Sequence, residues 1–102
     1  MHVHKLFFKA SSNETRLKII QLLKNRSLSV GEISQELDFE QSRVSHNLRC
    51  LEDCGFVNVE VKGNYRIYSL DKETILPILE LFDAHIKKYE KKLFCCAVLG
   101  EK

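Results

Sequence analysis

The chain has 102 residues, of which 44% are hydrophobic and 29% charged, and its formal net charge is +2. That length suits one small domain, which would gain stability from dimerisation. No run of about 18 apolar residues exists, so neither a transmembrane helix nor a membrane partner is expected. The N-terminus also lacks the apolar stretch of a signal peptide. These features predict a cytoplasmic protein.

Two helices are predicted in the first quarter of the chain. Apolar residues within the segment 3–10 fit a short first helix. Ser12 or Asn13 can cap a second helix, because their side-chain oxygens accept hydrogen bonds from the unpaired amides of a first turn. That helix ends near residues 25–27, and its apolar side chains recur at helical spacing: Leu17, Ile20 and Leu23.

Two further helices follow before the pattern changes. Ser29 and Glu32 are spaced as in a capping box, which starts a third helix that runs through Leu37. Residues 41–54 form a fourth helix, and Gly55 follows at the position where a left-handed C-terminal cap is favoured. The inward stripe of the fourth helix consists of Val44, Leu48 and Leu51.

A β-hairpin and a long last helix are predicted for the rest of the chain. Alternating segments at 57–61 and 65–70 flank Gly63-Asn64, which is a two-residue hairpin signal. Asp71 can cap a helix from about 72 to 95, with Pro77 in its first turns. An alternating spacing of four and three residues along this helix predicts a homodimer, although a helix packed wholly inside the monomer is the alternative. The residues of this apolar seam are Ile75, Leu79, Phe82, Ile86, Tyr89 and Leu93.

This order of elements, mainly α with a β-hairpin wing, is that of a winged helix-turn-helix. We therefore expect residues 1–102 to form a single DNA-binding domain that dimerises through its C-terminal helix. In this architecture the start of the second helix of the turn enters the major groove of double-stranded operator DNA. Polar side chains there suit base edges and phosphates, although any solvated helix face looks similar. The predicted contacts are Gln41, Ser42, Arg43, Ser45 and His46, with Arg49, Lys62 and Arg66 for phosphates.

Several short motifs resemble the ArsR/SmtB family of metal-responsive, dimeric winged-helix repressors, over roughly residues 5–90. The resemblance implies a repressor that binds operator DNA and releases it when an inducer ion binds. One departure is Asn47, because the histidine of this motif is more usually followed directly by leucine, and such a change bears on DNA contacts. The matching motifs are Asn13-Glu14-Thr15-Arg16-Leu17, the helix from Glu32 to Leu37, Ser42-x-Val44-Ser45, Gly55-Phe56-Val57 and the hairpin from Gly63 to Tyr68.

The four cysteines form two close pairs, Cys50 with Cys54 and Cys95 with Cys96. In a reducing compartment they indicate metal ligands, redox sensors or small buried hydrophobes rather than a disulfide framework. Residues four apart on a helix have Cβ atoms roughly 5–6 Å apart, so Cys50 and Cys54 can bind one soft ion. The resemblance extends to a cadmium- and lead-sensing member with the same spacing, which takes a third thiolate from its C-terminal region. It implies that Cys95 or Cys96 of the other subunit completes the site.

Cadmium, lead or arsenite (As(III)) are the expected inducers, with zinc possible and no organic cofactor. Another metal site of the family, an Asp-x-His on the last helix, is half present as Asp83 and His85, with Cys96 and Leu99 where its other ligands would fall. A Cys-x-Cys site in the third helix is absent. The vicinal pair of Cys95 and Cys96 alone is a further option.

Two rival functions remain open. The cysteines could form a redox-sensitive disulfide switch in a repressor of the same fold, or the domain could bind proteins without binding DNA. An enzyme is not expected, because the sequence contains no glycine-rich phosphate loop, HExxH motif or nucleophile elbow.

Overall fold

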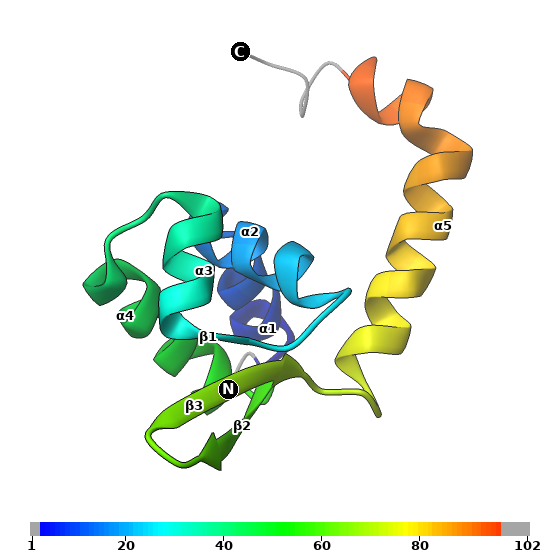
Figure 1. The fold of residues 1–102 in the computed structure, drawn as a ribbon. Helices are drawn as coiled ribbons and strands as arrows, with labels where there is room; N and C mark the ends of the chain where they lie inside the picture. The colour runs from blue at the N-terminus through cyan, green and yellow to red at the C-terminus, as the bar shows by residue number, and fades with distance from the viewer. Residues whose placement is uncertain (1–2, 97–102) are drawn as a thin grey trace. The chain divides into compact units, whose positions relative to one another are not determined.

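The computed structural model describes residues 3–96, and in that range it contains five helices and three short strands (Figure 1). The chain separates into two compact units, Met1–Asp71 and Lys72–Lys102. Among the helices of the described part, none is long and apolar enough to cross a membrane. The first unit contains every element except the last helix.

Side-chain caps fix where the early helices begin. After α1 (Val3–Ser12), the Asn13 side chain accepts a hydrogen bond from a first-turn amide of α2 (Glu14–Leu23), so Asn13 is the cap. Helix α3 (Val30–Leu37) starts with the predicted capping box. The Ser29 hydroxyl accepts from the Glu32 amide at 3.2 Å, and the Glu32 carboxylate accepts from the Ser29 amide at 2.9 Å. Two amides of the first turn that lack helical partners are thereby satisfied.

Helix α4 (Gln41–Asp53) ends in a Schellman motif, as the position of Gly55 predicted. Gly55 has a φ of +80°, and its amide donates to the Glu52 carbonyl at 3.0 Å. The Phe56 amide reaches back to the Leu51 carbonyl at 2.9 Å. The chain therefore reverses sharply at the end of α4 and enters the sheet, and Cys54 is the last residue before the reversal.

The wing is an antiparallel hairpin of β2 (Val57–Lys62) and β3 (Tyr65–Leu70), and the prediction of a turn at Gly63-Asn64 is confirmed. Gly63 has a φ of +62°, which suits the tight turn. A third strand, β1 (Leu28–Ser29), pairs with β3 and gives the order β1-β3-β2. This strand was not predicted, since two residues are too short to show any periodicity.

The core of the first unit lies between α2, α3, α4 and the sheet. Helix α4 packs on α2 and α3 and contacts β2. The predicted inward orientation of Leu17 is wrong, because its side chain is 40% exposed, whereas Thr15 and Ile19 on the same helix are buried. The largest fully buried side chains are Ile19, Ile20, Ile33, Val44, Leu48, Leu51 and Val57.

Helix α5 (Ile75–Phe94) makes up most of the second unit and begins later than predicted. Thr74 occupies the N-cap position without a capping hydrogen bond from its side chain, so the prediction that Asp71 caps this helix is wrong. The Asp71 carboxylate instead accepts from the Asn58 side chain at 3.4 Å, and its amide donates to the Phe56 carbonyl. Asp71 thus ends the sheet rather than starting the helix. Pro77 lies in the first turn of α5, as expected.

Candidate nucleic-acid interface

The start of α4 presents a polar face while its apolar stripe is buried. Val44, Leu48 and Leu51 have no exposed surface. The side chains predicted to contact DNA from this helix are all exposed: Gln41, Ser42, Arg43, Ser45, His46 and Arg49. The first turn and a half of α4 is therefore available to hydrogen-bond donors and acceptors of another molecule.

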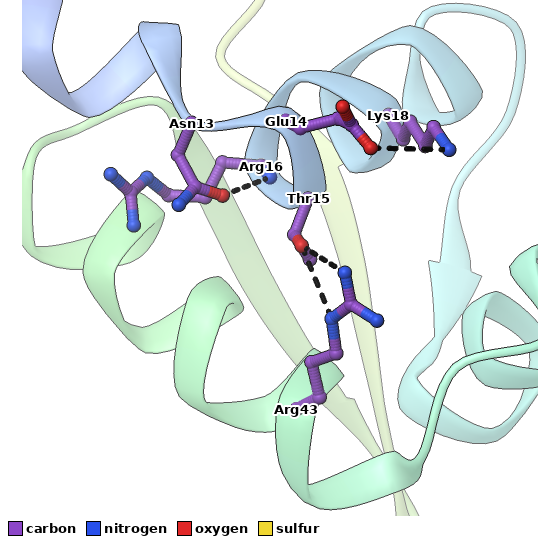
Figure 2. A network of polar contacts seen from close by, with 6 residues as sticks. All are labelled: Asn13, Glu14, Thr15, Arg16, Lys18 and Arg43. Carbon is purple, nitrogen blue, oxygen red and sulfur yellow. Dashed lines mark hydrogen bonds and ion pairs between the residues drawn. The ribbon is translucent and has the colours of Figure 1, made fainter.

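Arg43 is held by contacts within the protein (Figure 2). Its guanidinium donates from Nε and Nη2 to the Thr15 hydroxyl, at 3.1 and 2.6 Å. The guanidinium carbon also lies 3.8 Å from the centre of the Phe39 ring, within cation–π range. These contacts attach α4 to α2 and to the turn before α4. A base contact by Arg43 would compete with them.

Arg16 connects three helices through one side chain. Its Nε donates to the Ala10 carbonyl near the end of α1 at 2.7 Å, and its Nη1 donates to Asn47 Oδ1 in α4 at 3.2 Å. The Asn47 amide nitrogen donates in turn to the Arg43 carbonyl at 2.9 Å. Asn47 is only 8% exposed, so its side chain lies in the interior rather than at the DNA-contacting surface, contrary to expectation. Its place between Val44 and Leu51 on the buried stripe could have indicated this.

A hollow of about 360 Å³ connects the start of α4 with the wing. Gln41 and Arg66 both line it, together with residues from the start of α3 and the wing turn: Ser29, Val30, Gly31, Asn64 and Tyr65. Two predicted DNA contacts from separate elements therefore border one concave surface. Lys62 lies further along the wing with its ammonium 3.7 Å from the Glu60 carboxylate, and both side chains are well exposed.

Cys50 and Cys54 lie one turn apart at the other end of α4. The Cys54 amide donates to the Cys50 carbonyl at 3.1 Å. Cys50 is half-buried and Cys54 largely exposed. Partial burial raises the pKa of the Cys54 thiol, and repulsion by and hydrogen bonding with the Cys50 thiol raise this pKa further, against a lowering effect of Arg16. The two thiols are therefore close enough to interact, and the neutral form of Cys54 is favoured.

The second cysteine pair lies at the end of α5. Cys95 caps the helix and is exposed, whereas Cys96 is half-buried beside a shallow apolar hollow that also contacts Tyr89 and Leu93. The ring of His85 packs 4.8 Å from that of Tyr89, and Leu99 lies outside the described residues. Within residues 3–96, no three His, Cys, Asp or Glu side chains come together as metal ligands. A third thiolate from another subunit therefore stays a prediction.

Comparisons with known proteins identify the family. A model described as "Bacterial regulatory protein, arsR family" matches residues 13–59. The transcriptional activator HlyU of Vibrio cholerae is 36% identical over 76 residues, which are 74% of this chain and 70% of HlyU. The chain belongs to the arsR family. A probable mercury resistance operon repressor of Streptomyces lividans is 30% identical over 90 residues, which are 88% of this chain and 72% of the relative.

A solved arsR-family neighbour confirms the architecture. The structure of reduced HlyU from Vibrio cholerae superposes with a TM-score of 0.72 at 33% identity, over 80% of this chain and 86% of that chain. The winged helix-turn-helix prediction is thereby confirmed. As an arsR-family member the protein is a transcriptional regulator, and its relatives are regulators rather than enzymes.

Proposed function

We propose that the protein is a homodimeric, DNA-binding transcriptional repressor that releases its operator when Cys50 and Cys54 bind a soft metal or metalloid ion. One observation carries the proposal. The exposed polar residues at the start of α4 and the thiol pair, Cys50 and Cys54, at its end belong to the same rigid helix. An ion that moves or restrains the end of α4 therefore acts directly on the element that reads DNA.

The DNA-bound form uses two copies of α4 in successive major grooves, about 34–36 Å apart. Gln41, Ser42, Ser45 and His46 contact base edges or nearby phosphates from the start of each helix. The hollow between α4 and the wing receives the sugar–phosphate backbone, with Arg66 as its cation. Exposed apolar side chains along α5 support dimerisation through this helix: Leu81, Phe82, Ile86, Leu93 and Phe94.

The ion site consists of the thiol pair and a third thiolate, Cys95 or Cys96 of the other subunit. Thiolates select soft ions such as cadmium, lead or arsenite, and also bind zinc. A relative named as a probable mercury resistance operon repressor supports a soft inducer. Because the thiols must lose their protons, metal binding releases protons and weakens as the pH falls. By linkage, operator DNA weakens ion binding by the same factor by which the ion weakens DNA binding.

The test is an anaerobic titration of the protein on an operator selected from random duplexes. Cadmium, lead, zinc and arsenite are added while sulfur-to-metal absorption and DNA release are followed. We expect one ion to produce both signals in the wild type and neither in the Cys50→Ser/Cys54→Ser variant, which should still bind the operator. Operator binding that ignores every ion would refute the proposal, and failure of both forms to bind any duplex would favour a protein-binding module.

A redox switch is the second candidate. Only two thiols come together in the first unit, and a disulfide needs no more than two. A solved relative is also described as reduced HlyU, which names an oxidation state of that protein. Under this candidate, peroxide oxidises Cys50 and Cys54 to a disulfide, the chain loses two hydrogen atoms in mass, and the operator is released without metal. Release by peroxide that dithiothreitol reverses, with no response to ions, would establish this candidate over the first.

A further inference from the structure

An apolar hollow lies directly beside the thiol pair. It has a volume of about 210 Å³ and lies between α1 and the end of α4. The rings of Phe7 and Phe56 pack with their centres 5.0 Å apart in its wall. The thiol of Cys54 is the sole polar side-chain group among its lining residues, which are Val3, Leu6, Phe7, Cys54 and Phe56.

The size and walls of this hollow suit a compact organic group. An apolar protein cavity of roughly 150 Å³ binds benzene, so a hollow of about 210 Å³ has room for a phenyl ring or a short alkyl chain. Val3 is 63% exposed and Leu6 53% exposed, so the hollow opens to solvent through α1. A ligand can therefore enter without unfolding the helix.

The number of thiols at the hollow limits the ligand further. A bare trivalent arsenic bound by protein sulfur alone needs three thiolates, whereas only two come together in the first unit. An arsenic that already has one carbon bond needs two. We propose that Cys50 and Cys54 bind a trivalent organoarsenical with a single organic group, and that this group occupies the hollow beside Cys54. The inference rests on the proposed function, because it names the ligand class of the same thiol pair.

The reaction is a condensation without any change of oxidation state. A compound R–As(OH)₂ reacts with two thiols, two As–S bonds form and two As–O bonds break. Each hydroxide leaves with a thiol proton as water, and arsenic remains trivalent. The neutral thiols supply the protons themselves, so the reaction needs no oxidant and no third ligand. Burial of the R group against apolar walls then favours the organic compound over inorganic arsenite.

The experiment uses the full chain with Cys95→Ser/Cys96→Ser, so that the thiol pair is the only dithiol left. Phenylarsine oxide and inorganic arsenite are titrated anaerobically by calorimetry, and native mass spectrometry identifies the adduct. We expect a 1:1 phenylarsine adduct and an affinity at least about tenfold higher than that for arsenite. Adding Leu6→Ala should weaken phenylarsine binding by about fivefold or more and leave arsenite binding unchanged, because Leu6 contacts only the organic group.

Leu17→Ala in the same background is the matched control. Leu17 is also a partly exposed helical leucine, but it does not line the hollow. Equal affinities for the two arsenic compounds, or equal effects of Leu6→Ala and Leu17→Ala, would overturn the inference. If the wild type still releases its operator with inorganic ions in that case, only the organic-group site fails. Ion-dependent release that persists in Cys50→Ser/Cys54→Ser would instead refute the proposed function itself.

Discussion

A single buried amide links the recognition helix to the helices behind it. Asn47 accepts from Arg16 and donates to the Arg43 carbonyl, so both ends of its side chain are satisfied in a nearly closed site. Leucine has a similar shape but cannot form either bond, and it leaves a donor of Arg16 without its partner. We expect Asn47→Leu to lower the free energy of unfolding by about 1–3 kcal/mol in urea denaturation. Asn58→Leu, at an exposed asparagine with one long hydrogen bond, should change it by less than about 0.5 kcal/mol.

The protonation of Cys54 is the second prediction at this scale. Partial burial and the neighbouring Cys50 thiol raise the pKa of Cys54 in the folded protein. A raised pKa favours the neutral thiol, so the stability it contributes is complete below the pKa of the unfolded thiol, roughly 8.5, and is lost as the pH rises through the folded pKa. In the Cys50-containing protein, iodoacetamide should therefore alkylate Cys54 with a midpoint at higher pH than in the urea-unfolded chain. Cys50→Ser should move this midpoint downward, and an unchanged midpoint would contradict the assigned cause.

At the scale of the element, the end of α4 depends on one backbone conformation. Gly55 has a φ of +80°, and a Cβ added there would meet no atom within 4 Å. Gly55→Ala should thus cost about 1 kcal/mol of unfolding free energy through backbone strain alone. Gly31→Ala is the matched control, since Gly31 lies in α3 and its Cβ would only touch the Gln41 side chain at 3.9 Å. That change should be neutral or stabilising by up to about 1 kcal/mol in thermal or urea unfolding.

Elements with local causes could be predicted from the sequence, whereas contacts distant in sequence could not. The capping box of α3 and the Schellman end of α4 each depend on residues within one turn, and the structure has both. Strand β1 exists only because it pairs with β3 almost forty residues later. The hollow beside Cys54 likewise needs α1 and the end of α4 together. Asp71 was misassigned as a cap because its binding to the sheet depends on Asn58, not on its neighbours.

For the whole molecule, DNA binding depends on two copies acting together. The chain carries 16 basic and 14 acidic residues, so one protomer has little net attraction for a polyanion. Each protomer also offers only one α4 for the major groove. The affinity of the proposed dimer therefore comes from engaging two half-sites at once, and its salt dependence should report the phosphate contacts of both wings. Dimerisation and operator binding should accordingly be lost together.

Two substitutions in the apolar seam of α5 test this coupling. Phe82 and Ile86 are 45% and 47% exposed in the protomer, and one turn separates them on the predicted dimer face. Burying two glutamates in a dimer interface is costly, so Phe82→Glu/Ile86→Glu should give a monomer of about 12 kDa by sedimentation equilibrium. Losing the second half-site should then weaken operator binding by roughly 10²–10⁴-fold in a gel-shift assay.

The matched control is Ala84→Glu, which adds a carboxylate to the opposite face of the same helix. Residue 84 lies roughly 160° from both Phe82 and Ile86 on a helical wheel, so its carboxylate stays in water when the seam is covered. The control should remain dimeric and bind the operator like the wild type. A Phe82→Glu/Ile86→Glu protein that is monomeric yet binds DNA at full affinity would show that one α4 is sufficient. A dimer that persists with both glutamates would place the interface on another surface, because two charged side chains cannot remain buried without partners.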